Sequence, residues 1–406
     1  MAKGGNSVLV SYESDLTKEN LVDIRTLRSE KRKGLLEMCQ DNGSAWRTDY
    51  VQVPNKAAYF GLTTVNTTFN SSTTTIVLDN LAVFPVLIKP SHRILNGAGE
   101  LILVGSATTD VVYAASTITL TNCTRGAYSS TAVGATAADQ VEILSAAWTE
   151  NSSFVSSDHT ESTRQVFFTQ IYKYELEISG TADAMSSETI NGDANIQTQI
   201  QEGLDHLDQQ LQGDLIQMIH SGTGSTNSTT GIYANRNLRG LKSWIASYSG
   251  YTLSVGGALT TTILDNVQEQ LLKRGAVDDV AVAAGGFQGG SAPFVLLCNG
   301  TVKKSLNSLN ASRVRVDQNE RRIVNNSQQY VGAFGMDIMV VPDNVCRSSE
   351  AYIFRKDQIV CAPLQKRAFK VEPLAKTKDG MQYHIIGEYG VWVKNPETCA
   401  RLYSIS

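Results

Sequence analysis

The sequence predicts an α+β chain with a separate all-β domain inserted into it, and three observations support this fold class. Residues 61–147 are rich in Thr, Val and Ile and are interrupted at short intervals by Gly, Asn and Asp. Residues 193–220 place apolar side chains at steps of three and four, which is typical of one long amphipathic helix. The remainder, to residue 406, contains both helical and β-forming stretches. At roughly 150 residues per unit, the chain has room for two or three structural units.

Composition limits the classes of function. At 42% hydrophobic residues the chain can bury sizeable cores, and a net charge of -4 argues against a dedicated, strongly basic nucleic-acid binder. Weak contact with nucleic acid through a local patch remains open. No signal-peptide core and no run of about 20 apolar residues is found. We therefore expect synthesis in a cytoplasm and no membrane partner.

Residues with catalytic or metal-binding chemistry do not gather into motifs. The cysteines are widely spread, without a Cys-x-x-Cys pair, and no histidine has metal-ligand spacing. The loop Gly285–Gly290 lacks the Lys-Ser/Thr that closes a phosphate-binding loop, and no Gly-x-Ser-x-Gly nucleophile motif occurs. The sequence therefore predicts no enzyme, no cofactor, no metal and no disulfide framework.

Residues 16–40 predict a helical arm with a basic centre. The basic residues are Arg25, Arg28, Lys31, Arg32 and Lys33. Such a run is most often a solvated helix face, but in an assembly it could contact a polyanion or a neighbouring subunit. Both interpretations stay open.

Within residues 61–147, β-forming runs alternate with turn residues. The predicted strands fall within residues 73–80, 84–90, 99–105, 110–115, 116–122 and 140–144.

Residues 164–182 alternate over a length that exceeds the usual five or six residues of a strand. They predict a long strand or hairpin arm, with Phe168, Tyr172 and Tyr174 on one face and Phe167 on the other. Phe167, Phe168, Tyr172 and Tyr174 are therefore candidates for an assembly arm.

The predicted helix at 193–220 has Asp193 as a candidate N-cap and Gly222 as a candidate stop. Its stripe consists of Ile196, Ile200, Leu204, Leu207, Leu211, Leu215 and Met218. Beyond it, residues 260–274 predict a second helix with a Thr cap and a stop at Gly275. Strands are expected at 279–284, 293–300 and 334–343, a helix from residue 300, and a β-rich tail from residue 350.

Four stretches together resemble one protein family. They are GEYGVWVKNPETCARLYSI at 387–405, RQVFFTQIYKYELEISGTADA before the long helix, NRNLRGLKSWIAS at 235–247 and CTRGAYSSTAVGATAADQVEIL at 123–144. In this order they resemble the major capsid proteins of tailed bacteriophages with the Hong Kong 97-like fold, in the branch that carries a β-rich insertion.

The resemblance implies a division of the chain into six parts. They are an N-terminal arm (1–60), an inserted all-β domain (61–147), extended-arm strands (148–184), a spine helix and loop (185–234), an axial domain (235–360) and C-terminal strands of a peripheral domain (361–406).

The resemblance also implies a structural protein that forms hexamers and pentamers of an icosahedral shell enclosing double-stranded DNA. The expected partners are further copies of the chain, portal, scaffolding or decoration proteins, and packaged DNA through weak non-specific contact. The expected location is the virion capsid, assembled in the host cytoplasm. No Lys/Asn pair could be placed for covalent cross-linking, so none is expected. The alternatives are an encapsulin-like compartment shell and a phage tail or adhesin protein.

Overall fold

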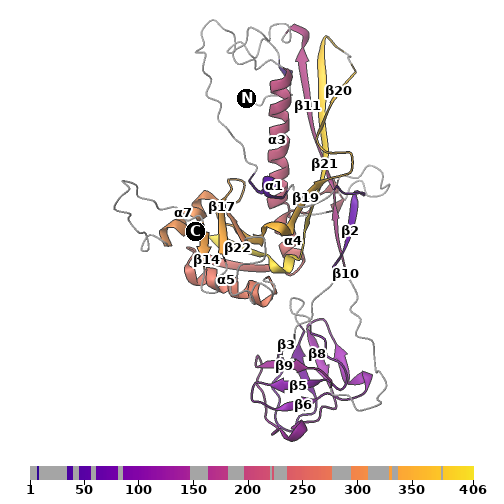
Figure 1. Cartoon of the computed structure of the whole chain (residues 1–406), viewed down its shortest axis with the longest axis vertical. Coiled ribbons are helices and arrows are strands. Elements are labelled where there is room, and N and C mark those ends of the chain that lie inside the picture. Colours follow the sequence, from indigo (N-terminus) through magenta and orange to yellow (C-terminus); the bar gives the residue numbers. More distant parts are fainter. Residues whose placement is uncertain are drawn as a thin grey trace. The chain divides into compact units, whose positions relative to one another are not determined.

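The structure, a computed structural model, describes residues 7–8, 34–39, 45–55, 61–80, 86–146, 163–181, 196–219, 222–223, 236–276, 294–309, 329–331, 337–375 and 378–406. The chain divides into two compact units (Figure 1). The first unit consists of Met1–Gln52 and Val166–Ser406, and the second unit is Val53–Gln165.

The first unit contains a long five-stranded sheet, in the order β1-β11-β21-β19 with β20 also paired to β21. Its strands are β1 (Ser7–Val8), β11 (Gln170–Ser179), β19 (Ile359–Pro363), β20 (Lys370–Pro373) and β21 (Gly380–Val393). β11 and β21 pair antiparallel along the whole of β11, from Gln170↔Tyr389 to Ser179↔Gly380. This pairing makes them the backbone of the sheet.

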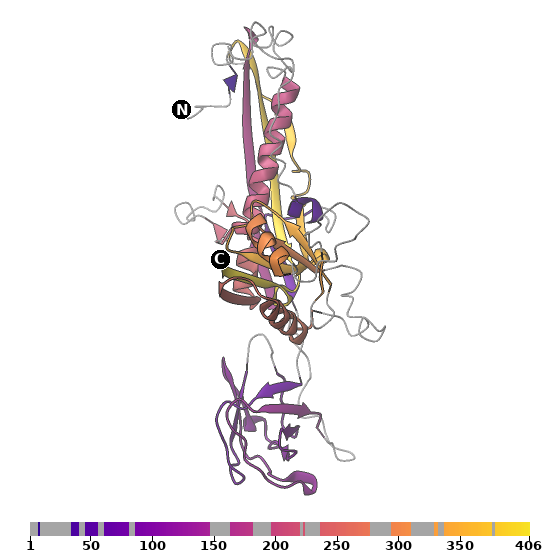
Figure 2. The ribbon, with the colours of Figure 1, turned by 90° about the vertical axis from the view of Figure 1, so that its left-hand side faces the viewer.

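Helix α3 (Ile196–Gln217) lies lengthwise along β11 and β21, as both Figure 1 and Figure 2 show. Its 22 residues give a length of about 33 Å. Leu207, Leu211 and Leu215 are fully buried, so the predicted apolar stripe is confirmed at these positions. The candidate cap Asp193 lies outside the described residues. Gly222 does not directly follow the helix but begins the short strand β12 (Gly222–Thr223).

The predicted long strand or hairpin arm at 164–182 is divided in the structure, which interrupts the strand at Thr169 and leaves the long strand β11 after it. β10 (Thr163–Phe168) ends before this residue and β11 begins after it. The backbone N–H of Thr169 donates to the carbonyl of Asp49 at 2.9 Å, outside either strand ladder. The buried side of the chain changes here, from Phe167 and Thr169 to Tyr172. A single alternating pattern could not describe both strands.

The remainder of the first unit is built on a six-stranded sheet, in the order β14-β22-β18-β15-β17-β16. Its strands are β14 (Tyr251–Gly257), β15 (Phe294–Cys298), β16 (Gln329–Val331), β17 (Asp337–Pro342), β18 (Ala351–Arg355) and β22 (Ala400–Ile405). The associated helices are α4 (Leu241–Ser247), α5 (Thr261–Lys273) and α7 (Gly300–Leu309). The C-terminal strands grouped by the sequence analysis are thus divided, with β21 in one sheet and β22 in the other.

Helix α5 confirms its predicted ends. The Thr260 hydroxyl accepts a hydrogen bond from the backbone N–H of Ile263 at 3.3 Å, which satisfies one unpaired donor of the first turn. Gly275 follows the helix with φ +73, a conformation that glycine adopts without strain. Leu264, Val267 and Leu271 are buried in a core shared with the six-stranded sheet.

The second unit packs a four-stranded sheet and a three-stranded sheet around one hydrophobic core. The four-stranded sheet has the order β3-β9-β5-β6 and consists of β3 (Leu62–Thr64), β9 (Gln140–Leu144), β5 (Arg93–Asn96) and β6 (Leu101–Leu103). The three-stranded sheet has the order β4-β8-β7 and consists of β4 (Ile76–Asp79), β8 (Thr117–Leu120) and β7 (Val111–Tyr113).

The described part of the second unit contains strands and short 3-10 turns but no α-helix. The prediction missed β5 and β3. It also placed a strand at 84–90, where the described residues 86–89 form none. Val86 and Ile88 are nevertheless buried in the core. Their hydrophobicity therefore reflects burial and not pairing in a β-sheet.

The chain enters and leaves the second unit through paired strands. β2 (Tyr50–Asn55) and β10 form a two-stranded sheet. Val53 and Gln165, the bounds of the second unit, lie within these two strands. This is the connectivity of an inserted domain, whose ends usually lie close together.

Two remaining sequence predictions fall largely outside the described residues. Of the arm at 16–40, the structure describes only α1 (Gly34–Cys39), in which Leu35 and Leu36 are buried. The predicted strand at 279–284 is not described. In the described ranges, no helix combines the length and apolarity needed to span a membrane.

Gly203 and Gly213 provide a test of how closely α3 packs on the sheet. A Cβ on Gly203 would lie 2.6 Å and 2.8 Å from ring atoms of Tyr174 and 2.9 Å from Ile385 Cδ1. A Cβ on Gly213 would meet only Val345, at 3.9 Å. We expect Gly213→Ala to raise the free energy of unfolding by about 0.4–1 kcal/mol. Overpacking of a core costs about 1–3 kcal/mol. We therefore expect Gly203→Ala to lower the free energy of unfolding.

Urea unfolding of the unassembled chain measures both variants, with Gly213→Ala as the control for helix propensity. A gain for Gly203→Ala equal to that for Gly213→Ala would contradict the close approach of α3 to β11.

Candidate assembly surfaces and the buried ion pairs behind them

The buried carboxylate of Glu388, in β21, connects several segments of the first unit. Glu388 is 1% exposed. Its oxygens accept the Thr169 hydroxyl at 2.5 Å, Arg236 Nη2 at 2.7 Å and Arg367 Nε at 3.1 Å. A buried charge is tolerated when it is paired and hydrogen-bonded in this way. The three donors come from parts of the chain that are distant in sequence.

Arg236, in β13 (Arg236–Asn237), extends this network to the segment before β2. Its Nη1 lies 2.6 Å from Asp49 Oδ2, and its Nε donates to the carbonyl of Thr169 at 3.3 Å. One guanidinium therefore binds Asp49, Thr169 and Glu388. It fixes the place where β2 and β10 join the five-stranded sheet.

Two of the four predicted arm aromatics are core residues of the subunit itself. Phe167 is fully buried between Trp46 and Trp244, with ring centroids 5.1 Å and 5.8 Å away. Tyr172 is also buried, and its hydroxyl donates to Asp214 at 2.9 Å. Burial and the charge of Asp214 raise the pKa of Tyr172. Any effect of these two residues on assembly would act through the subunit core.

The other two arm aromatics are half-buried. Phe168 packs against Tyr50 with ring centroids 5.0 Å apart, and Tyr174 packs against His206 at 5.6 Å. Tyr50 is 39% exposed, so the pair Tyr50–Phe168 presents aromatic surface where β2 meets β10. Contact of these aromatics with a neighbouring subunit stays a prediction.

A second buried carboxylate, Glu350, joins α4 to the six-stranded sheet. It lies 2.8 Å from Lys242 Nζ and 3.0 Å from Arg401 Nη2, and it accepts the Tyr352 hydroxyl at 2.6 Å. Burial alone would raise its pKa. The three donors outweigh burial and hold the pKa of Glu350 at about 2. The side chain therefore stays charged in all but strongly acidic solution.

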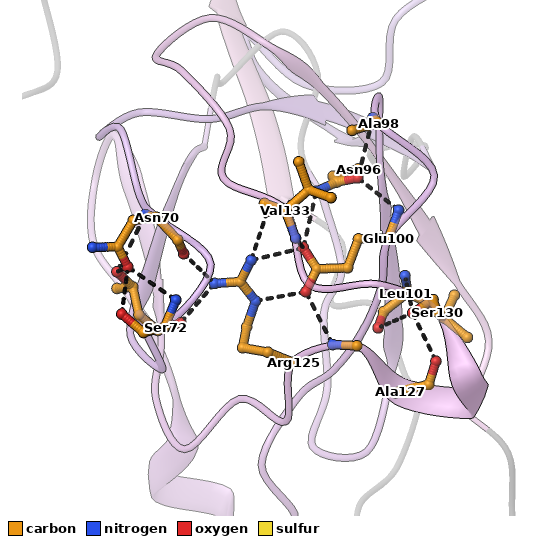
Figure 3. Close-up of polar contacts among 12 residues, drawn as sticks. Asn70, Ser72, Asn96, Ala98, Glu100, Leu101, Arg125, Ala127, Ser130 and Val133 are labelled. Atoms are coloured by element: carbon orange, nitrogen blue, oxygen red, sulfur yellow. Dashed lines mark hydrogen bonds and ion pairs between the residues drawn. The ribbon is translucent and has the colours of Figure 1, made fainter.

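In the second unit, the buried carboxylate that joins separate segments is that of Glu100, which forms an ion pair with Arg125 (Figure 3). The Glu100 side chain is fully buried, and its oxygens lie 2.8 Å from Nε and 2.7 Å from Nη2 of Arg125. The backbone N–H groups of Gly126 and Val133 also donate to it, each at 3.0 Å. Such a bidentate pair is short, directional and strong.

The remaining donors of Arg125 bind loop carbonyls. Its Nη1 donates to the carbonyl of Thr73 at 2.9 Å and also to that of Asn70, and its Nη2 donates to that of Val133 at 2.7 Å. Its guanidinium lies 4.9 Å from the ring centroid of Phe69. Figure 3 shows Arg125 between the turn at Asn70 and the carboxylate of Glu100. Arg125 thereby connects the turn at 70–73, the carboxylate of Glu100 and the loop 126–133.

The loop 126–133 takes a strained shape over this ion pair. Tyr128 and Ser129 both have left-handed backbone conformations, with φ 54 and φ 66. Such values are uncommon for residues other than glycine and genuine outliers for bulky ones. Ser130 fixes the loop by accepting from the N–H of Leu101 at 3.0 Å and donating to its carbonyl at 3.3 Å. The result is that Tyr128 is 61% exposed.

The described residues contain little that could carry out catalysis. Across the described ranges, no three His, Cys, Asp or Glu side chains gather as a metal site. All six cysteines are free and buried. Burial raises the pKa of each thiol, which disfavours the reactive thiolate.

The basic run Arg25, Arg28, Lys31, Arg32 and Lys33 lies outside the described residues, and so does the loop Gly285–Gly290. Contact of the basic run with a polyanion or a neighbour stays a prediction.

Sequence reasoning gave no role to Glu388, Glu350, Glu100 or Arg236. A signal existed for Glu100 and Arg125, because each is a lone charge inside a stretch of β-forming residues. Charges of this kind are almost never fully buried unless they are paired. No local pattern marks Glu388, since its partner Thr169 is 219 residues away.

Replacing Glu100 tests the ion pair of the second unit. Burial would raise the pKa of Glu100, but Arg125 and the N–H groups of Val133 and Gly126 lower it below the ordinary value. The stabilisation is therefore present above about pH 4.3 and is lost as the pH falls through the folded-state pKa. Glu100→Gln leaves Arg125 buried without a counter-charge, so we expect a loss of roughly 3–5 kcal/mol.

Hydrogen exchange of residues 126–133 and thermal unfolding, each between pH 3 and pH 7, measure this effect. Glu142→Gln is the matched control, because Glu142 is exposed and has no ion pair within the described part of the chain. A Glu100→Gln chain with the same stability and the same pH dependence as the unmodified chain would refute the role of the pair.

The fold is similar to the cyanophage A-1(L) capsid asymmetric unit, with a TM-score of 0.58 at 10% identity over 98% of this chain and 99% of that chain. A Gordonia phage Cozz structure gives a TM-score of 0.47 at 10% identity, over 98% and 93% of the two chains. The capsid of cyanophage P-SCSP1u gives 0.43 at 13% identity, over 64% and 80%. With TM-scores below 0.5, the last two likenesses do not establish a fold by themselves.

Sequence comparison supplies the family. No curated protein sequence matches the chain. The family model described as SU10 major capsid protein matches residues 19–406, which is nearly the whole chain. The chain therefore belongs to the SU10 major capsid protein family and is a structural protein of the phage capsid, not an enzyme.

Proposed function

We propose that this chain is the repeating coat subunit that assembles into hexamers and pentamers of an icosahedral shell around double-stranded DNA. The observation that carries the proposal is the extent of the likeness to a capsid subunit. It covers 98% of this chain and 99% of the other, so both units of this chain are included. The family match over residues 19–406 supports the same function.

The open edge of β11 suits a subunit that pairs with neighbours. On the side away from β21, β1 covers only Glu177 and Ile178. Within the described ranges, the rest of this edge, from Gln170 to Leu176, has no strand partner. A long unpaired edge promotes unwanted association in a monomer, but in a lattice it offers backbone hydrogen bonds to another chain.

Exposed apolar side chains add to this surface. Among the described residues of the first unit, the large exposed apolar side chains are Tyr50, Ile171, Ile219, Leu374 and Met381. Single residues of this kind are common on monomers. Repetition in a closed shell allows modest contacts of each subunit to add up, because many weak contacts form at once.

The net charge of the subunit is compatible with DNA that is packaged inside the shell and binds to it only weakly. The net charge of -4 gives little general attraction to phosphate. Local contact would come from a basic segment, and Arg25–Lys33 is the candidate. Portal, scaffolding or decoration proteins complete the proposed set of partners.

Electron microscopy of the expressed chain, together with size-exclusion chromatography, tests the proposal. We expect closed shells, capsomers, tubes or sheets, because the subunit carries its own lattice contacts. Particles from infected cells are expected to contain nuclease-resistant DNA. Particles filled with a protein cargo and no genome would instead indicate a compartment shell.

A monomer at every concentration and ionic strength, with and without co-expressed phage proteins, would contradict the proposed function. Circular dichroism of the same sample is the control, since it establishes that the chain is folded.

A further inference from the structure

The outward face of the four-stranded sheet in the second unit is unusually apolar. Side chains alternate across a strand, so the neighbours of the buried residues Ile94, Ile102 and Val141 point away from the core. Five leucines lie on this outward side, namely Leu62, Leu95, Leu101, Leu103 and Leu144, together with Thr64, Arg93, Gln140 and Glu142. An antiparallel sheet that faces water normally shows polar residues there.

The strand register places these residues side by side. Leu62 pairs with Glu142, Glu142 with Leu95, and Leu95 with Leu101. In the next row, Arg93 pairs with both Leu144 and Leu103. We call these two rows the leucine face; it consists of Leu62, Arg93, Leu95, Leu101, Leu103, Glu142 and Leu144. Leu62 is 52% exposed, and the other four leucines are partly exposed.

The strained loop adds an aromatic residue to the leucine face. The guanidinium of Arg93 lies 5.9 Å from the ring centroid of Tyr128. Exposed tyrosines are frequent anchors of protein interfaces. Backbone strain persists only where surrounding structure enforces it, and here the ion pair of Glu100 and Arg125 does so. The unit therefore uses buried interactions to hold Tyr128 at this face.

The two charges of the leucine face are complementary but not paired with each other. Arg93 donates through Nε to the carbonyl of Ser145 at 3.0 Å. Glu142 has no ion pair within the described part of the chain. The two residues are diagonal neighbours on adjacent strands, because Glu142 pairs with Leu95. A two-fold axis passing between them would oppose Arg93 to Glu142 of the partner subunit, twice, and leucines to leucines.

We infer that the leucine face binds the same face of a second copy of this chain across a two-fold axis. A surface that is complementary to itself meets the requirement of an isologous contact. The inference rests on the proposed coat function, which supplies the second copy.

The size of the leucine face decides when the contact forms. Four strands at about 4.8 Å and two rows of side chains, which span about three residues at about 3.3 Å, give an area of roughly 200 Å². A stable dimer commonly buries about 800 Å² on each partner. We therefore expect the contact in the assembled lattice, where other contacts hold the copies in place, and not in the unassembled chain.

Thiol labelling of the full chain tests the inference. Leu62→Cys places a reactive thiol on the leucine face, while all six native cysteines are buried. Val112→Cys is the matched control, because Val112 is 53% exposed on the outward side of the three-stranded sheet. We expect assembly to slow maleimide labelling of Leu62→Cys about tenfold or more, since interface cores exclude solvent, and to leave Val112→Cys unchanged.

A charge exchange provides the second measurement. We expect Glu142→Arg and Arg93→Glu each to lower the yield of particles, and the double exchange to restore it. Urea unfolding of the unassembled variants controls for folding, because Arg93 also contacts Ser145 and Tyr128. Two folded single variants without rescue in the double variant would overturn the inference.

Electron microscopy of each sample separates this inference from the proposed function. Particles in which Leu62→Cys labels as fast as before assembly would overturn the inference and leave the coat function intact. Protection only after addition of another phage protein would assign the face to that protein and also overturn it. The inference would also be overturned if Leu62→Cys were labelled slowly in the unassembled chain. The same holds if assembly protected Val112→Cys from labelling as strongly as Leu62→Cys. Absence of particles under all conditions would overturn the coat function and this inference with it.

Discussion

Neutralisation of the buried carboxylate of Glu388 is the constraint on which the first unit depends. Isolated in the interior, this charge would cost several kcal/mol. Thr169, Arg236 and Arg367 satisfy it only when three distant segments reach β21 together. Correct connection of β2, β10 and β11 is therefore coupled to correct burial of one side chain.

A buried carboxylate paired with an arginine also occurs in the second unit, where it has a different structural effect. Arg125 and Glu100 join loops and not strands, and they determine the shape of a surface. Hydrophobic packing alone tolerates several loop arrangements, because it has no direction. Hydrogen bonds to a guanidinium and a carboxylate select one of them. In this chain, apolar cores supply stability and buried ion pairs supply geometry.

Local patterns in the sequence predicted the elements, but not how they meet. The stripe of α3 and the Thr260 cap of α5 were predictable because they depend on neighbouring residues. The break at Thr169 was not, since it is imposed by Asp49 and Glu388 from elsewhere in the chain. The leucine face was hidden because β3 and β5 are short, and its two rows exist only in the sheet register.

Because β2 pairs with β10, the second unit of the chain can change in evolution independently of the first unit. The chain leaves the first unit on one strand and returns on its neighbour, so a tight turn could close the same ribbon. What lies between these strands can change in length and sequence without altering the sheets of the first unit. The second unit could therefore be lost or exchanged between these two strands while the sheets of the first unit are kept.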